Sequence, residues 1–238
     1  MKFKLYTKSH NEDLLKAIDN NGKQFTEHEH EYVVKKELGN LNREEYLSLN
    51  NDKPHVVDWL TDYIKKNNFK NIISMGAGNC FLEYKLKCKL PECNITATDF
   101  DSFFIDKSKE FFPSINSIKF DFFKDNVESL KSEFDLAIFL GSTYVMDDSQ
   151  FINLFSQFKA IGTRQIIDFQ GGYIEYRDVP IYFASNILRK LNIIKSYRGK
   201  FHGYGRTKDE FERIYKKLGI GVIETHIEPY KHVAICKL

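Results

Sequence analysis

The stretch Asn71-Ile72-Ile73-Ser74-Met75-Gly76-Ala77-Gly78-Asn79-Cys80 decides how this chain is organised. A short apolar run before Gly76 predicts a buried parallel strand, and two glycines spaced one apart then turn the chain into a helix that begins near Cys80. Glycine suits such a loop because the backbone takes unusual angles there and a ligand can approach the main chain, which a Cβ would block. The stretch therefore predicts a nucleotide-binding strand, loop and helix.

Three further predicted strands end in residues that suit the rest of a nucleotide. The next strand ends at Asp99, whose carboxylate can accept hydrogen bonds from both hydroxyls of a ribose. The third ends at Asp121 and Phe122, which offer an acceptor for an adenine amino group beside an aromatic face. The fourth ends at Gly141-Ser142-Thr143-Tyr144. Four strand ends in order thus present a glycine loop, an acid, an acid with an aromatic ring, and Gly-Ser.

This ordered series resembles the motifs of class I S-adenosylmethionine-dependent methyltransferases, and the resemblance covers roughly residues 53–238. It implies a Rossmann-like α/β fold, with a seven-stranded, mainly parallel sheet, an antiparallel last strand and helices on both faces. It also implies S-adenosyl-L-methionine as the methyl donor and S-adenosyl-L-homocysteine as the product. The donor-binding residues that it implies are Met75, Gly76, Ala77, Gly78, Asn79, Asp99, Phe100, Asp121, Phe122, Leu140, Gly141 and Ser142. The family often has a third glycine where this chain has Cys80, which leaves the path of the methionine end of the donor open.

The same residues also occur in other nucleotide-binding folds and in ordinary turns. A nicotinamide or flavin Rossmann fingerprint would need glycine at position 81, where the bulky Phe81 stands, and a P-loop would need Gly-Lys-Ser/Thr after the glycines. A lone Gly-x-Gly is often an ordinary turn, Asp99 could cap a helix, and Asp121 could be a simple turn residue. The ordered series favours the methyltransferase over these readings.

The order of predicted strands and helices indicates two parts. Residues 53–238 form the α/β domain, because parallel strands must be joined by crossover helices. Residues 1–52 are expected to form an N-terminal helical cap, with short helices at residues 12–18, 27–38 and 43–49. Such a cap would lie over the donor and exclude water from its methyl group.

The end of the chain adds the topological argument. The strands expected at residues 221–228 and 231–238 are joined by only two residues, so they must be antiparallel neighbours. A sheet closed in this way resembles the methyltransferase fold and not the dinucleotide-binding fold. Residues 170–205 form an insert longer than a compact link needs, with an extra helix at 181–194, and its flanks are expected to line the substrate site.

Charge, apolar runs and cysteine spacing limit which partners the sequence predicts. The 238 residues hold 35 Lys and Arg against 33 Asp and Glu, so the formal charge of +2 does not indicate nucleic-acid binding. The longest apolar runs have the length of strands and no signal peptide is evident, which predicts a cytoplasmic protein without a membrane partner. A monomer and a homodimer are both compatible with the sequence. No metal is expected, since Cys80, Cys88 and Cys93 lack zinc-ligand spacing and His28 and His30 would point apart on a helix.

The acceptor side is predicted from aromatic and basic residues in the cap and the insert. The candidate substrate contacts are Tyr32, Tyr173, Arg177, Tyr204 and Arg206, and the candidate catalytic residues are His202 and Tyr144. Thr207 and Glu210 are spaced as a capping box, which would set the preceding residues at a helix N-terminus, a setting that favours anions. A purely structural loop is the competing interpretation of this segment.

The predicted function is therefore methyl transfer from S-adenosylmethionine to a small-molecule or saccharide-like acceptor at oxygen, with nitrogen left open. An oxygen acceptor needs a general base, for which His202 is the first candidate. A nucleic-acid amino methyltransferase is disfavoured, because the Asn/Asp-Pro-Pro-Tyr sequence that those enzymes share is replaced by Gly141-Ser142-Thr143-Tyr144. A non-catalytic S-adenosylmethionine-binding regulator or partner subunit remains the other alternative.

Overall fold

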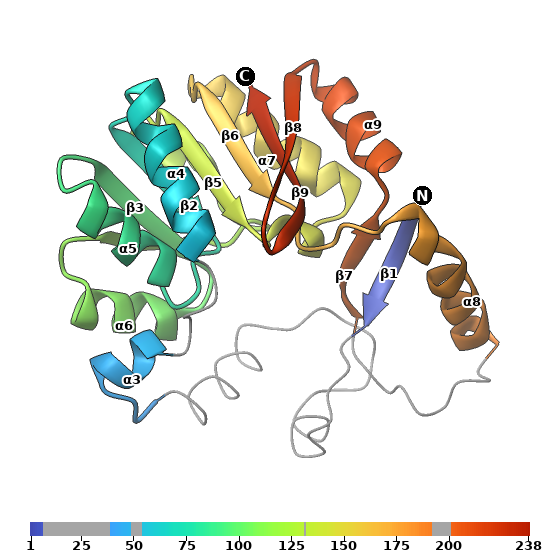
Figure 1. Cartoon of the computed structure of the whole chain (residues 1–238), viewed down its shortest axis with the longest axis horizontal. Coiled ribbons are helices and arrows are strands. Elements are labelled where there is room, and N and C mark those ends of the chain that lie inside the picture. Colours follow the sequence, from blue (N-terminus) through green and yellow to red (C-terminus); the bar gives the residue numbers. More distant parts are fainter. Residues whose placement is uncertain (7–38, 49–53, 131, 192–200) are drawn as a thin grey trace.

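The computed structural model describes residues 1–6, 39–48, 54–130, 132–191 and 201–238. They form a large twisted sheet covered by helices on both faces, and a small two-stranded sheet beside it (Figure 1). The strands are β1 (Lys2–Tyr6), β2 (Asn71–Met75), β3 (Asn94–Asp99), β4 (Asn116–Lys119), β5 (Leu136–Leu140), β6 (Gln165–Phe169), β7 (Phe201–Arg206), β8 (Gly221–Ile227) and β9 (Tyr230–Lys237). The α-helices are α3 (Arg43–Ser48), α4 (Pro54–Asn67), α5 (Phe81–Lys89), α6 (Ser102–Phe111), α7 (Asp148–Ala160), α8 (Val179–Lys190) and α9 (Lys208–Leu218). Short 3-10 turns are η1 (Val127–Leu130), η2 (Thr143–Val145) and η3 (Tyr176–Asp178).

The large sheet has seven strands in the order β4-β3-β2-β5-β6-β9-β8. The ladders from β4 across to β6 are parallel, whereas β9 runs antiparallel to both β6 and β8. The predicted seven-stranded sheet with an antiparallel last strand is therefore confirmed. The strand order reverses between β2 and β5, and ligands of open α/β sheets bind at such a point, outside the carboxyl ends of the strands.

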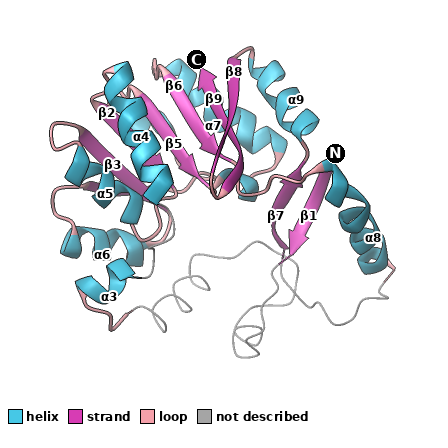
Figure 2. Ribbon diagram, in the orientation of Figure 1, coloured by secondary structure: helices cyan, strands magenta, loops and turns pink. Residues whose placement is uncertain are grey.

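Two hydrophobic layers sandwich the sheet because successive side chains of a strand point to opposite faces. Ile73 of β2 and Phe139 of β5 pack with α7 and α9, whereas Ile72 and Ile138 pack with α4 and α5 on the other side. Figure 2 shows these helices on the two faces of the sheet. The continuous apolar runs of β2 and β5 are typical of parallel strands buried on both faces.

The short helix α3 lies next to the glycine loop and not over the centre of the sheet. Its Tyr46 is buried and packs with Cys80 and Phe112, in a third, smaller cluster. Helix α3 confirms the helix expected at residues 43–49 to within one residue. The helices expected at 12–18 and 27–38 lie outside the described residues.

The beginning of the chain differs from the prediction. Residues 2–6 form strand β1, which pairs antiparallel with β7 in the separate small sheet. The predicted cap at residues 1–52 is therefore not wholly helical, and its first residues join the insert at 170–205. Within that insert the extra helix is α8, and its last part is strand β7 where a loop was expected.

The predicted capping box at the start of α9 is wrong. Thr207 is the N-cap residue, but its hydroxyl accepts a hydrogen bond of 2.7 Å from the Met1 ammonium and does not cap the helix. Glu210, in turn, pairs with Arg213 at 2.6 Å. The contact between β1 and α9 has replaced the local cap, because the strand end delivers a stronger donor to the same oxygen.

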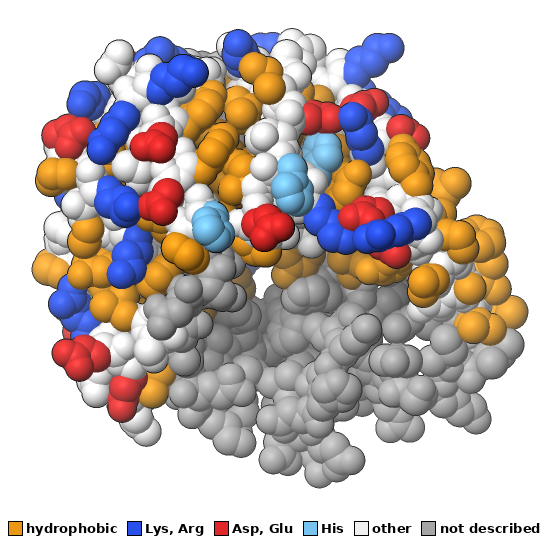
Figure 3. Space-filling model, viewed as in Figure 1, with side chains coloured by type: hydrophobic (Ala, Val, Ile, Leu, Met, Phe, Trp, Pro, Cys, Tyr) orange, Lys and Arg blue, Asp and Glu red, His pale blue; other side chains and the backbone are white. Residues whose placement is uncertain are grey.

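Charged side chains are mixed on the visible face of the molecule. Figure 3 shows Lys and Arg interspersed with Asp and Glu over that face. Apolar side chains gather at its edge over α8, whose Ile181 and Phe183 are 68% and 57% exposed. The surface in view thus matches the near-neutral charge of the whole sequence.

Candidate functional site

The glycine loop after β2 is tied to the end of β3. The backbone N–H groups of Gly76 and Ala77 both donate to the carbonyl of Thr98, at 2.9 and 2.8 Å. Met75, at the end of β2, is fully buried beneath the loop. Gly76 and Gly78 have φ values of +72° and +55°, a region that glycine adopts without steric cost. The unusual backbone angles expected of this loop are therefore present.

The two glycines of this loop differ in what surrounds them. A Cβ on Gly76 would lie 2.9 Å from the Cβ of Ser142 and 3.2 Å from the Phe122 ring, so this glycine allows close packing of three strand ends. A Cβ on Gly78 would meet nothing within 4 Å of the described structure. The loop thus leaves open space in front of Gly78, as a site for a bound ligand against the main chain requires.

Asp99 lies beside this space and is itself 5% exposed. One carboxylate oxygen accepts from the Gly78 N–H and the other from the Asp101 N–H, both at 2.9 Å. A carboxylate offers about four lone-pair sites, so Asp99 is chemically suited to accept from ribose hydroxyls as predicted. Phe100, the next residue, is half-buried, and Asn79 accepts from the Phe81 N–H at 3.4 Å.

The position of the missing third glycine is occupied by a residue in a glycine-like conformation. Cys80 has φ +56°, precedes α5 directly and is fully buried. Burial raises the pKa of its thiol, with the carboxylates of Glu83 and Asp99 adding to the effect. The departure from the family pattern therefore changes the side chain while the backbone keeps the turn.

The third strand end contributes an aromatic ring and an internally bonded acid. Phe122 lies close to Gly76 and between the rings of Phe120 and Phe139, at centroid distances of 6.5 and 6.3 Å. The Asp121 carboxylate accepts from the Phe123 N–H at 2.9 Å and pairs with Lys124 at 2.8 Å. Asp121 thus also serves the local turn, the role that the competing interpretation gave it.

The fourth strand end joins the glycine loop to the interior of the sheet. The Ser142 hydroxyl donates to the Met75 carbonyl at 2.9 Å, and the Gly141 N–H donates to the Phe169 carbonyl at 2.8 Å. Gly141 has φ +67°, and Leu140 packs against the cluster on the α4 side. The turn is therefore anchored to β2 on one side and to β6 on the other.

Tyr144 is enclosed by glycines from two other segments. A Cβ on Gly172 would lie 2.7 Å from the Tyr144 Cβ, and one on Gly171 would lie 3.2 Å from its ring. A Cβ on Gly203, in β7, would come within van der Waals overlap of both the ring and the carbonyl of Tyr144. These three glycines, which we call the glycine cage, explain why the insert carries Gly171-Gly172 and a glycine at position 203. Burial raises the pKa of the Tyr144 phenol, so it is protonated at neutral pH.

A buried polar network behind Tyr144 was not predicted. The Thr143 hydroxyl donates to Asp168 at 2.9 Å, and the Tyr215 hydroxyl donates to the other oxygen of that carboxylate at 3.3 Å. Gln170 donates to Tyr215 at 2.5 Å. The available signal was an acid inside the apolar run of β6, since buried acids need partners or a shifted pKa.

Helix α3 also supplies a residue that the sequence did not single out. The buried Tyr46 hydroxyl has no hydrogen-bond partner among the described residues. Burial raises its pKa, and the charges on Cys80, Asp99 and Asp101 raise it further, which puts this phenol near the glycine loop. A polar atom of a bound ligand could satisfy it.

The predicted substrate residues occupy different environments. Tyr173 stacks on His232, with centroids 4.8 Å apart, and Tyr204 is half-buried with Lys2 above its ring at 5.0 Å. Arg177 is an exposed side chain that pairs with Glu175 at 2.5 Å. Tyr32 lies outside the described residues. For His202 the structure gives the backbone within β7, next to Gly203 of the glycine cage, and its side chain lies outside the described part.

Arg206 differs most from its predicted role. Its side chain is fully buried, donates to the Met146 carbonyl at 2.7 Å and pairs with Asp148 at 2.9 Å. A guanidinium bound in this way ties β7 to the start of α7. Arg206 thus forms a buried ion pair with Asp148 in this structure.

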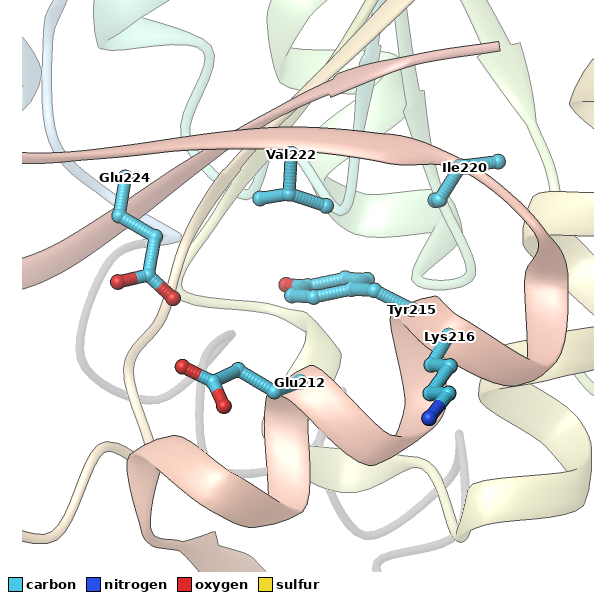
Figure 4. Close-up of a pocket in the computed structure, with 6 residues that line it drawn as sticks. All are labelled: Glu212, Tyr215, Lys216, Ile220, Val222 and Glu224. Carbon is cyan, nitrogen blue, oxygen red and sulfur yellow. The ribbon is translucent and has the colours of Figure 1, made fainter.

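The structure also shows a pocket that contains none of the predicted residues. It has a volume of about 490 Å³ and lies between α9 and β8, the edge strand of the large sheet (Figure 4). Its lining residues are Glu212, Tyr215, Lys216, Ile220, Val222 and Glu224. Lys208 pairs with both of its carboxylates, at 3.6 and 2.5 Å, so the polar side of the pocket is already neutralised.

Two absences hold for the described part of the chain. No group of three or more His, Cys, Asp or Glu side chains there is arranged to hold a metal ion. No helix there is both long and apolar enough to cross a membrane.

The strand order, the antiparallel β9 and the glycine loop after the first strand of the sheet define the class I S-adenosylmethionine-dependent methyltransferase fold. Solved structures with this fold include an O-methyltransferase family protein from Burkholderia thailandensis, with a TM-score of 0.58 and 10% identity over 82% of this chain and 57% of that one. Human N-acetylserotonin methyltransferase in complex with SAM has a TM-score of 0.53 and 15% identity, over 95% of this chain and 65% of that one. Magnesium protoporphyrin IX methyltransferase from Synechocystis PCC 6803, with bound SAH, has a TM-score of 0.52 and 11% identity, over 76% and 80%.

The extent of these similarities limits them to the fold. This chain spans a little over half the length of several of the solved structures that it matches. No protein-family model and no curated protein matches the sequence.

Proposed function

We propose that this chain is an S-adenosylmethionine-dependent methyltransferase that acts on a small-molecule or saccharide-like acceptor, at oxygen. The observation that carries the proposal is the open space in front of Gly78, bordered by the acid Asp99. Gly78 has a positive φ, and a Cβ at this position would meet no described atom within 4 Å. The fold of the solved methyltransferases supports the same reading.

The residues present fit the donor at several points. Asp99 would accept from the ribose hydroxyls, and the half-buried Phe122 would lie against the adenine. Ser142 and Met75 would hold the loop that backs the sulfonium end. The Tyr46 hydroxyl, buried and without a partner among the described residues, would donate to a polar group of the donor.

Bound S-adenosylmethionine supplies an activated methyl group, so the chain needs to align the acceptor and exclude water. Tyr144 is neutral at physiological pH because burial raises its pKa, which makes it a hydrogen-bond donor and not a base. Its position in the glycine cage fixes the ring at the carboxyl edge of the sheet. We propose that the Tyr144 hydroxyl orients the acceptor oxygen by donating a hydrogen bond to it.

The remaining roles come from β7 and the insert. His202 is proposed as the general base, since it precedes Gly203 of the glycine cage and an imidazole can take a proton near neutral pH. Tyr173, Arg177 and Tyr204 would line the acceptor side. Arg206 is not included, because its guanidinium is buried against Asp148.

Two measurements test the proposal in order. Isothermal calorimetry with S-adenosylhomocysteine tests the donor site, and failure of the wild-type protein to bind would overturn the assignment. Turnover of S-adenosylmethionine is then measured with a small-molecule cell extract as the acceptor source. Binding without S-adenosylhomocysteine formation across such extracts would favour the alternative, a non-catalytic S-adenosylmethionine-binding regulator or partner subunit.

The catalytic roles are tested with extracts that support turnover. His202→Ala is expected to lower the rate by about 10² or more while donor affinity stays unchanged. Tyr144→Phe keeps the ring that fills the glycine cage and removes only the hydroxyl, so it should weaken turnover without unfolding the protein. A fully active His202→Ala enzyme would remove the base and indicate a nitrogen acceptor.

A further inference from the structure

We propose that Asp168 is a positioning residue, which sets how the Thr143–Tyr144 turn is held and does so differently in its charged and neutral forms. Asp168 belongs to β6 and reaches no surface, being 0% exposed. The inference concerns a residue to which the proposed function gives no role. Only its consequence for catalysis rests on the proposed function of Tyr144.

The Asp168 carboxylate is held by hydroxyl groups from two other elements. Both of its oxygens accept hydrogen bonds, one from Thr143 at 2.9 Å and the other from Tyr215 at 3.3 Å. Tyr215 is committed to this direction, because it accepts from the Gln170 amide at 2.5 Å. Two acceptor oxygens facing two hydroxyl donors fit an ionised carboxylate.

Protonation of Asp168 would change its hydrogen bonds. A carboxylic acid carries one O–H donor and keeps acceptor capacity on both oxygens, so the hydroxyl at which the new O–H points must turn round and accept. Tyr215 already accepts from Gln170, whereas Thr143 has Asp168 as its hydroxyl partner. The rearrangement therefore falls on Thr143, the first residue of η2.

Side chains from four elements surround Asp168 and influence its charge. Tyr215 of α9, Arg206 of β7 and Cys236 of β9 face it, together with Thr143 of η2. Burial raises the pKa of Asp168 to about 7, although the hydrogen bonds and the Arg206 charge act in the opposite direction. Tyr215 stays protonated, because burial and the neighbouring Asp168 charge raise its pKa. The carboxyl is thus the group among them that changes state near neutral pH.

Thr143 connects Asp168 to Tyr144. Thr143 is fully buried and is bonded to Tyr144 through one peptide unit. The cage glycines Gly171 and Gly172 follow Asp168 closely in the chain, so β6 holds Tyr144 both through the Thr143 hydroxyl and through the cage. A change at the Thr143 hydroxyl is therefore transmitted to a ring that has little freedom to move.

Fluorine NMR of protein labelled with 3-fluorotyrosine tests this directly, with the Tyr144 and Tyr215 resonances assigned from Tyr144→Phe and Tyr215→Phe. The chain has 13 tyrosines, few enough to resolve. The Tyr144 resonance is expected to shift with a single midpoint at a pH of about 7. Asp168→Asn, which keeps the shape and one acceptor, should abolish that shift.

The matched pair at position 143 tests the route. Thr143→Val keeps the shape and removes the hydroxyl, so the Tyr144 shift should disappear while the Tyr215 shift remains. Thr143→Ser keeps the hydroxyl and should retain both shifts. A Tyr144 shift that persists in Asp168→Asn, or in Thr143→Val, would overturn the proposal. A shift abolished by His202→Gln but retained in Asp168→Asn would assign the effect to His202 of β7 instead.

The result is independent of methyl transfer. Calorimetry with S-adenosylhomocysteine on the same samples reports on the donor site, so loss of donor binding with an intact titration would sink the proposed function alone. An intact donor site with no titration of Tyr144 would sink this inference alone. Thermal unfolding of each variant at one pH shows that the fold persists.

Discussion

At the scale of single residues, Cys80 shows how the glycine loop tolerates a departure from the usual pattern. Its φ of +56° is one that residues with a Cβ avoid, at a cost on the order of 1 kcal/mol. The side chain offsets that cost by burial in the cluster with Tyr46 and Phe112. The turn into α5 therefore depends on a balance between backbone strain and packing.

That balance predicts an unusual order of stabilities. Cys80→Ala is expected to lower the free energy of unfolding by about 1 to 2 kcal/mol, because it removes a buried sulfur and keeps the strained backbone. Cys80→Gly removes one atom more but also removes the strain, so it should be no less stable than Cys80→Ala. Urea unfolding of both variants measures the difference. A glycine variant that is less stable by about 1 kcal/mol, as in an ordinary helix, would show that the strain is absent.

Gly78 gives the second prediction at this scale. Gly78→Val should abolish binding of S-adenosylhomocysteine, because the branched side chain would occupy the open space in front of the loop. Gly219 is the matched control, since it has a φ of +61° and nothing within 4 Å of its Cβ, but lies at the end of α9. Gly219→Val therefore carries the same backbone strain without blocking the donor.

Calorimetry on the two variants separates strain from obstruction. Both should lose a comparable amount of stability, of order 1 kcal/mol or more, and only Gly78→Val should lose affinity. Unchanged affinity in Gly78→Val would refute the assignment of the loop. Equal loss of affinity in both variants would show that general destabilisation is the cause.

At the scale of secondary structure, the elements that local sequence determines were the ones that could be predicted. Strands β2, β5 and β6 are apolar runs bounded by turn residues, and each begins within one residue of its expected position. Strand β1 was not predicted, because Lys2–Tyr6 is only five residues long and its partner β7 lies about 200 residues away. Its alternation of Lys with Phe and Leu fits a strand, but so short a pattern does not identify a partner at that range.

The candidate site divides in the same way. Gly76, Gly78 and Asp99 could be predicted, since strand ends in a parallel sheet meet at one edge. The burial of Arg206 could not, because its partner Asp148 lies on another element and the pair forms only in the folded chain. The glycine cage was equally hidden, because its glycines look like ordinary loop residues until Tyr144 is placed among them.

Helix capping gives the prediction at this scale. Asp147 caps α7 in a complete capping box, in which it accepts from the Gln150 N–H and the Gln150 side chain accepts from the Asp147 N–H, both at 2.9 Å. Asp147→Ala should cost about 1 kcal/mol of stability, whereas Asp147→Asn should cost little, because asparagine caps equally well. Thr207→Ala provides the contrast, since the Thr207 hydroxyl makes no cap.

The effect of Asp147 should depend on pH. Burial would raise the pKa of this carboxyl, but hydrogen bonds from Ser149 and Gln150 lower it below its usual value. A lowered pKa in the folded state means that the stabilisation is present above the unfolded value and is lost as pH falls through the folded one. The stabilities of Asp147→Ala and wild type in urea should therefore converge as the pH falls below the ordinary aspartate value of 3.8. A difference that stays constant as the pH falls below that value would show that charge plays no part in the cap.

At the scale of the whole molecule, the sheet is sandwiched between two apolar layers, and Asp168 is an acid inside one of them. It shares its face of β6 with Ile166, in the cluster that α7 and α9 cover. Burying an ionised carboxyl there costs free energy, which the hydrogen bonds from Thr143 and Tyr215 offset only in part. Ionised Asp168 therefore lowers the stability of the fold, at the position that we propose positions Tyr144.

That cost predicts how stability changes with pH. The pKa of Asp168 is raised from 3.8 to about 7 by burial, so between these values the folded state binds a proton that the unfolded state has released. Stability due to this group is therefore full below a pH of about 4 and falls as pH rises towards about 7, at up to about 1.4 kcal/mol per pH unit. Asp168→Asn carries no such proton, so relative to wild type it should gain stability across that range by about 1 to 4 kcal/mol. Comparing the two proteins in urea at each pH cancels groups that they share, among them His232, whose pKa is lowered by burial. A difference that is flat with pH, or that grows towards acid, would mean that Asp168 remains ionised throughout, held by Arg206 and its two hydroxyl donors.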